Sequence, residues 1–295
     1  MTKRAGVIGH PLGHSISPAV YRAAFEAAGV DAVYEAWDTP EDTLQGRVDA
    51  LRGADFLGAN VTIPHKQAVL PMLDGTSELA GKAGAVNTIV HQDDGKLIGH
   101  NTDVAGFARS LKEDAKFDAV RQACVVLGSG GAARAVALAL IEAQASTIFV
   151  FGRKPRKIDQ LVLQLKPLTP SGTTISWAYW GDGSFLRALG NAGLVVNCTP
   201  IGTAGSDTGG QSPIDVSLLG DGATVFDLVY NPPDTPLVAA AKARGLNAVS
   251  GLGMLVYQAA ESFRLWTGKD ADIAAMLGAG REALGLMAPP AAKST

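Results

Sequence analysis

The feature that most constrains the fold is a short apolar run that leads through glycines into an alanine-rich stretch, ACVVLGSGGAARAVALALIEA, from residue 123. The run is typical of a buried strand, and the stretch after it is typical of a helix. Gly128, Gly130 and Ala133 fit the pattern G-x-G-x-x-A. Such glycines permit a tight turn and a close approach of a pyrophosphate, which free N–H groups at the helix start would bind. The sequence therefore predicts a dinucleotide-binding turn, for which a generic strand-to-helix turn is the alternative.

The end of the next predicted strand favours one of the two nicotinamide cofactors. The sequence FVFGRKPRK has no carboxylate there to accept hydrogen bonds from an adenine ribose. It has instead four cations within five positions, Arg153, Lys154, Arg156 and Lys157. A basic cluster on a slightly acidic chain favours an anion such as a 2′-phosphate, so we expect NADP, with NAD as the alternative. Arg153 is the first candidate because it is nearest the strand end. A solvated basic loop would leave the same pattern.

Strand-like and helix-like segments alternate along most of the chain, which predicts an α/β protein with parallel β-α units. A hairpin is expected where Asp94-Gly95 separates AVNTIVH from KLIGHNTD. Helices are expected from Ser17, as N-cap before Pro18, and over 105–116. The apolar runs that predict strands are AGVIG, VYEAWD and FLGANVT before residue 100 and ACVVLG, STIFVFG, LVVNCTP, TVFDLVY and NAVSG after it. This pattern indicates two α/β lobes with a cleft between them, the second of Rossmann type.

The first lobe contains two segments in which chemistry-bearing residues lie among small polar ones. Ser15 and Ser17 in HSISP would lie on one side of an extended segment at a helix start, a good carboxylate site; simple capping by Ser17 is the alternative. Lys66, in NVTIPHK, would lie in the first turn of a helix that starts at Pro64. The helix dipole and burial would lower the pKa of Lys66, whereas Asp103 as a partner would raise it. A plain surface lysine is the alternative.

Bulk composition excludes several classes of protein. The formal net charge is -3, with 25 basic and 28 acidic residues, so neither nucleic acid nor an anionic membrane is an expected partner. No apolar run is long enough to span a membrane, and no Cys or His spacing matches a zinc site. We therefore expect a soluble, cytoplasmic protein without a metal.

Taken together, these motifs resemble the shikimate dehydrogenase family over nearly the whole chain. GHPLGHSISP looks like that family's carboxylate-binding segment, and NVTIPHK looks like its lysine motif. AVNT and GHNTD are similar to its asparagine and aspartate motifs, and GSGGAARA with GRKPRK is similar to its NADP loop and basic clamp. NCTPIG, FDLVYNPPDTPL and GLGMLVYQAA match later signatures in the family's order.

The resemblance implies a role for each matching residue. Lys66 and Asp103 would be the acid–base pair, and Ser15 and Ser17 would hold the substrate carboxylate. The residues that would bind the ring hydroxyls of the substrate or line the cleft are Thr62, Lys66, Asn87, Asp103, Gln258 and Tyr230. The cofactor would be bound by Gly128, Ser129, Gly130, Gly131, Ala132, Arg153, Lys154, Arg156, Thr199 and Gly251.

The implied activity is reversible reduction of 3-dehydroshikimate to shikimate with NADPH, in the aromatic amino acid (chorismate) pathway. Residues 1–104 and 252–288 would form the substrate-binding domain, residues 105–251 the NADP-binding domain, and residues 289–295 a disordered tail. We expect a monomer or homodimer. Two departures weaken the preference for NADP: Gly152 stands where the family usually has asparagine, and Lys154 where threonine is frequent. A quinate or aminoshikimate dehydrogenase, or a non-catalytic dinucleotide-binding regulator, would share the same overall pattern.

Overall fold

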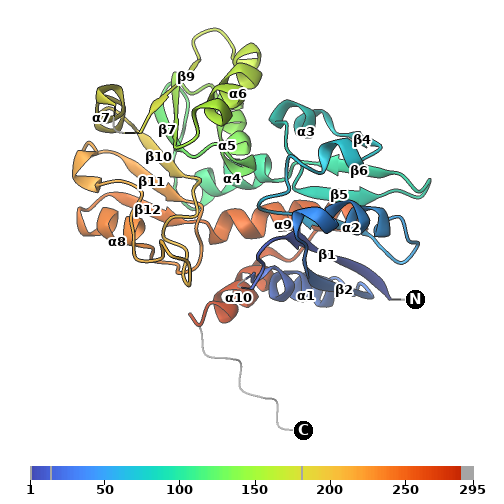
Figure 1. Ribbon diagram of the computed structural model, residues 1–295. Coiled ribbons are helices and arrows are strands. Elements are labelled where there is room, and N and C mark those ends of the chain that lie inside the picture. The colour runs from blue at the N-terminus through green and yellow to red at the C-terminus, as the bar shows by residue number, and fades with distance from the viewer. Residues whose placement is uncertain (1, 14, 181, 287–295) are drawn as a thin grey trace.

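A computed structural model describes residues 2–13, 15–180 and 182–286 of the 295-residue chain. They form two lobes, each built around its own six-stranded sheet, and helices α4 and α9 run between them (Figure 1). The expected α/β class with a Rossmann-type second lobe is confirmed. The expected tail, residues 289–295, lies outside the described residues.

The sheet of the first lobe is mixed, with strand order β2-β1-β3-β5-β6-β4. Strand β1 pairs in parallel with both β2 and β3, whereas β5 is antiparallel to β3 and to β6. The expected hairpin is therefore present between β5 and β6, and Gly95 in its turn has a φ of 82°. The strands are β1 (Lys3–Gly9), β2 (Ala32–Asp38), β3 (Gly58–Val61), β4 (Gly75–Thr76), β5 (Thr88–His91) and β6 (Leu97–His100).

The sheet of the second lobe is parallel throughout, with strand order β12-β11-β10-β7-β8-β9. This is the strand order of a dinucleotide-binding sheet, whose direction of winding reverses between β7 and β10. Ligands of such sheets bind at this reversal, at the carboxyl ends of the strands. The strands are β7 (Ala123–Leu127), β8 (Thr147–Gly152), β9 (Thr174–Tyr179), β10 (Leu194–Asn197), β11 (Thr224–Asp227) and β12 (Asn247–Ser250).

Helices cover both sheets and connect them. Helix α9 contributes Val256 and Phe263 to the core of the first lobe, and α4 contributes Phe107, which packs edge-on against Phe226 of β11. The helices are α1 (Ser17–Ala27), α2 (Leu44–Ala50), α3 (Glu78–Ala83), α4 (Asp103–Glu113), α5 (Gly131–Glu142), α6 (Pro155–Leu165), α7 (Gly183–Gly190), α8 (Pro236–Ala243), α9 (Leu252–Thr267) and α10 (Ile273–Ala283). Single 3-10 turns are η1 (Glu41–Thr43), η2 (Leu70–Met72), η3 (Lys166–Leu168) and η4 (Val216–Leu218).

Two predicted details of the first lobe are wrong. No helix begins at Pro64: the chain after β3 makes a series of turns as far as η2, so Lys66 is not in a helical turn. Ser17 is not the N-cap of α1 but its first residue; Ile16 is the cap, and Pro18 is second. Because Ser17 is helical, the expectation that Ser15 and Ser17 lie on one side of an extended segment does not hold.

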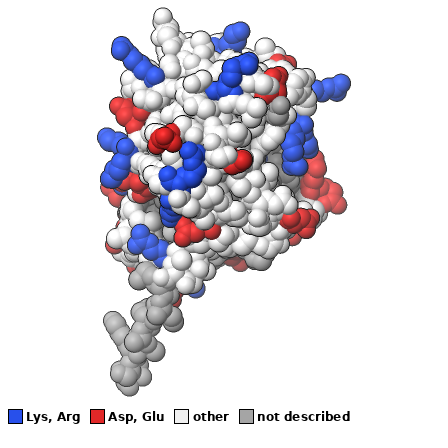
Figure 2. All heavy atoms as spheres, turned by 90° about the vertical axis from the view of Figure 1, so that its left-hand side faces the viewer, with Lys and Arg blue, Asp and Glu red and all other residues white. Residues whose placement is uncertain are grey.

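The surface is mixed in charge where Figure 2 shows it. Blue and red side chains are interspersed there among uncharged ones, with no broad patch of one sign over the described residues of that face. Among the described residues there is also no helix long and apolar enough to cross a bilayer.

Candidate active site

Lys66 and Asp103 form an ion pair in the first lobe, where two loops of its sheet come together. The distance from Lys66 Nζ to Asp103 Oδ2 is 2.5 Å, and the two side chains are 13% and 6% exposed. Lys66 lies in the turns after β3, and its carbonyl accepts a hydrogen bond from Val86 N at 2.7 Å. Asp103 is the first residue of α4. The pair therefore owes its position to a backbone hydrogen bond between the segments that follow β3 and precede β5, and to the start of α4.

Asn87 holds the other carboxylate oxygen of Asp103. Its Nδ2 donates to Asp103 Oδ1 at 2.9 Å, and lies within hydrogen-bonding distance of Thr102 Oγ1 and Gln258 Oε1. Its Oδ1 accepts from Thr102 N at 2.7 Å. Because both Nδ2 and Oδ1 of Asn87 already have hydrogen-bond partners, Asn87 orients Asp103 directly. It would bind a substrate hydroxyl only by exchanging one of these partners.

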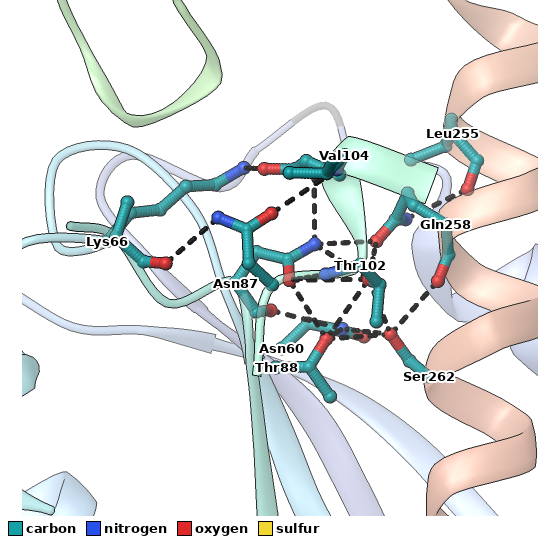
Figure 3. A network of polar contacts seen from close by, with 12 residues as sticks. Asn60, Lys66, Asn87, Thr88, Thr102, Val104, Leu255, Gln258 and Ser262 are labelled. Carbon is teal, nitrogen blue, oxygen red and sulfur yellow. Dashed lines mark hydrogen bonds and ion pairs between the residues drawn. The ribbon is translucent and has the colours of Figure 1, made fainter. Parts of the chain in front are cut away.

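A second layer of buried hydroxyls supports Asn87 (Figure 3). Ser262 on α9 has its Oγ 2.7 Å from Thr88 Oγ1 and 3.1 Å from Thr102 Oγ1. Asn60 on β3 donates to both Ser262 and Thr88 at 3.1 Å. Sequence reasoning did not find these four residues, because no local pattern brings a helix near the C-terminus beside β3. The network is internally satisfied, which rigidifies the site.

The predicted dinucleotide-binding turn has the geometry that its sequence requires. Gly128 has a φ of 124°, and a Cβ there would lie 3.1 Å from Cys198 O, directly after β10. Gly130 is exposed and is the N-cap of α5, and a Cβ there would meet nothing within 4 Å. An anion can therefore approach the first turn of α5, with Ser129, Gly131 and Ala132 around it. The turn lies where the winding of the second sheet reverses, as a dinucleotide site should.

The basic cluster lies at the carboxyl end of β8, beside this turn. Arg153, Lys154 and Arg156 are all exposed, and none of them forms an ion pair with a carboxylate in the described ranges. Gly152 packs against Ile158, so a side chain there would have little room. Unpaired cations at this edge suit a phosphate on the adenine ribose, so the residues present fit NADP.

Among the described residues, no side-chain hydrogen bond or ion pair joins the remaining candidates to Lys66 or Asp103. Ser15 lines a hollow of about 430 Å³ together with Arg22 on α1 and Asn231 from the second lobe, but Lys66 and Asp103 do not line it. Thr62 directly follows β3, and burial raises the pKa of the Tyr230 phenol.

Thr199 and Gly251 are fixed by the second lobe. The Thr199 hydroxyl lies 2.6 Å from Asn197 Oδ1, just after β10. Gly251 caps α9, and a Cβ there would clash with the carbonyl oxygen of Leu228. Thr199 follows β10 and Gly251 follows β12, so both lie at the carboxyl ends of strands in the second sheet, where the topology places a dinucleotide.

Comparison with known proteins agrees with this geometry. A family model described as the shikimate dehydrogenase substrate binding domain matches residues 7–89, and one described as the shikimate 5'-dehydrogenase C-terminal domain matches residues 251–279. A shikimate dehydrogenase (NADP(+)) of Moorella thermoacetica is 41% identical over 285 residues, 96% of this chain and 94% of that protein. The chain belongs to the shikimate dehydrogenase family.

Solved structures of family members have the same architecture. The shikimate 5-dehydrogenase of Thermus thermophilus, in complex with NADP(H) and shikimate, has a TM-score of 0.82 at 39% identity, and covers 96% of this chain and 100% of its own. A quinate dehydrogenase of Corynebacterium glutamicum in complex with NAD has a TM-score of 0.83 at 34% identity, covering 94% of this chain and 98% of its own. The fold thus occurs both in a shikimate dehydrogenase bound to NADP(H) and shikimate and in a quinate dehydrogenase bound to NAD.

Proposed function

We propose that this protein is an NADP-dependent shikimate dehydrogenase, which interconverts 3-dehydroshikimate and shikimate in aromatic amino acid biosynthesis. One observation carries the proposal: the largely buried Lys66–Asp103 pair, at 2.5 Å, in the lobe beside a dinucleotide-binding turn. Oxidation of a secondary alcohol needs a hydride acceptor on one side and a proton acceptor on the other. The two lobes supply these two functions separately.

The residues of the first lobe act on the proton. Lys66 Nζ and Asp103 Oδ2 share one hydrogen bond, so a substrate hydroxyl beside them can pass its proton to the pair. In the reverse direction, the pair returns the proton and stabilises negative charge on the carbonyl oxygen. Asn87 keeps Asp103 oriented throughout. NADP, when bound, supplies the hydride chemistry.

Binding roles follow from position and chemistry. Ser15 and Ser17, at the start of α1, supply hydroxyls and helix N–H groups for the substrate carboxylate. Thr62, Asn87, Asp103, Gln258 and Tyr230 are the proposed contacts to the ring. Residues 128–132, Thr199 and Gly251 are the proposed contacts to the dinucleotide, and Arg153, Lys154 and Arg156 the contacts to its 2′-phosphate. Accordingly, we assign substrate binding to the domain formed by residues 1–104 and 252–288, and cofactor binding to the domain formed by residues 105–251.

The test is absorbance of the reduced nicotinamide in four mixtures: shikimate or quinate, each with NADP or NAD. Rapid reduction with shikimate and NADP alone is the expected result. Activity that favours quinate, or NAD, would replace the proposed specificity while leaving the reaction class intact; aminoshikimate is a further substrate to try. Absence of activity in all four mixtures would favour a non-catalytic dinucleotide-binding protein.

A further inference from the structure

Arg134 is a buried cation that the proposed chemistry does not use. It lies near the start of α5 and is 5% exposed, and no carboxylate pairs with it in the described part of the chain. Its NH1 donates to Gln164 Oε1, whereas its Nε has no partner among the described residues. Burying a cation against a neutral amide instead of an anion costs stability. This cost indicates that the Arg134–Gln164 contact has a role other than stabilising the fold.

Gln164, on α6 of the second lobe, extends this contact to the first lobe. Its Nε2 donates to Lys82 O at 3.2 Å, with Gly81 O at 3.5 Å, in the last turn of α3. The same amide lies against Gly84, which ends α3 with a φ of 61°, and a Cβ there would clash with Gln164 Nε2. The site around Gly84 is therefore shaped to admit the Gln164 amide.

The segment reached by Gln164 carries the backbone that holds the acid–base pair. Val86 N donates to Lys66 O at 2.7 Å, and Asn87 Nδ2 donates to Asp103 Oδ1 at 2.9 Å. Both residues lie just after Gly84 along the chain. A displacement of this segment relative to α5 would therefore reach both members of the pair.

We propose that Gln164 is a positioning residue for the reaction: held by Arg134, it fastens the two dinucleotide-binding helices to the segment that holds Lys66 and Asp103. Helix α5 begins at the glycine-rich turn, and α6 begins directly after the first cations of the basic cluster. The link thus joins the proposed hydride side of the site to its proton side without touching substrate or cofactor. This inference rests on the proposed dehydrogenase function.

Three variants test the proposal on the full-length protein. Gln164→Leu removes the amide at similar size. Gln164→Glu keeps a partner for Arg134 but cannot donate to Lys82 O. Gln160→Leu is the matched control, because Gln160 is exposed on the same helix one turn earlier.

Five quantities are measured for each variant. They are kcat and KM with shikimate and NADP, the deuterium isotope effect on kcat with shikimate deuterated at the reacting carbon, the Kd for NADP, and the radius of gyration of the cofactor-free protein by X-ray scattering. Thermal unfolding is recorded in parallel. The isotope effect and the radius of gyration report alignment, which a purely stabilising contact would not change.

Both Gln164 variants are expected to lower kcat about fivefold and raise the isotope effect, because small misplacements of reacting groups slow the chemical step. The Kd for NADP should stay within about twofold of the wild type, since no proposed cofactor contact is removed. The radius of gyration should increase in both variants, whereas Gln160→Leu should match the wild type throughout.

Other outcomes overturn the proposal. Wild-type kcat and isotope effect in both Gln164 variants would show that the contact does not position the pair. A lower Tm with unchanged kcat per folded molecule would reduce it to a stabilising contact. If Gln164→Leu does not fold, Gln164→Glu decides by the same criteria. If the wild type is inactive in every mixture of substrate and cofactor, the proposed function fails. Independently of activity, an unchanged radius of gyration in the Gln164 variants would show that Gln164 does not hold the two lobes together.

Discussion

The side chain of Lys66 packs against Gly131, the first residue of α5. A Cβ placed on Gly131 would lie 2.8 Å from Lys66 Cβ and 2.9 Å from Lys66 Cδ. The residue proposed to move the proton therefore touches the helix proposed to hold the dinucleotide. This contact requires glycine at position 131, for a reason that the dinucleotide-binding pattern does not include.

Gly131→Ala is expected to lower kcat by roughly tenfold, because the added methyl group must push Lys66 away from its position beside Asp103. Gly130→Ala is the matched control, since a Cβ there meets nothing within 4 Å. It should weaken NADP binding while leaving kcat at saturating cofactor near the wild-type value. Steady-state kinetics at saturating NADP distinguish the two, and an unchanged kcat in Gly131→Ala would show that Lys66 tolerates the displacement.

Lys66→Ala should lower kcat by about 10²- to 10⁴-fold, the range for loss of a general acid–base group. The Kd for NADP, measured by fluorescence titration, should remain nearly unchanged. Lys242→Ala, which removes an exposed cation paired with Asp234, is the control. Thermal unfolding accompanies the kinetics, because the variant leaves Asp103 buried without its cation. Wild-type turnover in Lys66→Ala would exclude a catalytic role for this lysine.

Ser15→Ala should raise the KM for shikimate about tenfold with little effect on kcat, as expected for a contact made equally in the ground state and the transition state. Ser206→Ala, on an exposed loop of the second lobe, should change neither constant. The result matters because the hollow that Ser15 lines does not include Lys66 or Asp103. A normal KM would move the carboxylate site away from Ser15.

Arg153→Ala should weaken NADP binding by about tenfold or more and NAD binding by less than about twofold, since only NADP carries the 2′-phosphate. Arg281→Ala removes another exposed cation, on α10, and should affect neither cofactor. Titrations with both cofactors give the ratio directly. Equal losses for NADP and NAD would mean that Arg153 does not recognise the phosphate.

The sequence predicted the second lobe better than the first for a physical reason. Strands buried in a parallel sheet read as continuous apolar runs, and β7, β8, β10 and β11 were found in this way. Strand β9 (Thr174–Tyr179) at the sheet edge is only partly buried and gave no such signal. A helix was expected from Pro64 because proline is favoured at the first position of a helix, but the Lys66 carbonyl accepts a hydrogen bond from Val86 N instead of from its own turn.

The candidate site was predictable only as separate pieces. The motifs around Lys66, Asn87 and Asp103 marked the residues, and the structure brings these three together as expected. The second layer was not predictable, because the hydroxyls of Thr88 and Ser262 meet across 174 positions of sequence. Such contacts follow from how the helices pack on the sheet, which no local pattern encodes.

A last prediction concerns Asp227, at the end of β11 beneath the proposed cofactor site. It is fully buried, and burial raises the pKa of its carboxyl from 3.8 to about 6, because the charged form is disfavoured there. The folded state therefore holds this proton more tightly than the unfolded state does. Stability contributed by this group is present at pH 4 and is lost as the pH rises through about 6.

Asp227→Asn removes this titration. Its side-chain oxygen can still accept hydrogen bonds from Asn197 Nδ2 and Val229 N, and its NH2 group can donate one to Thr235 Oγ1. Denaturant unfolding of both proteins at pH 4, 5, 6 and 7 gives the difference in unfolding free energy at each pH. That difference should shift in favour of the variant by about 2 kcal/mol between pH 4 and pH 7, because a small part of the effect of the raised pKa is already lost at pH 4. A difference that stays constant would mean that Asp227 is ionised in the folded protein over the whole range, with its three hydrogen bonds outweighing burial.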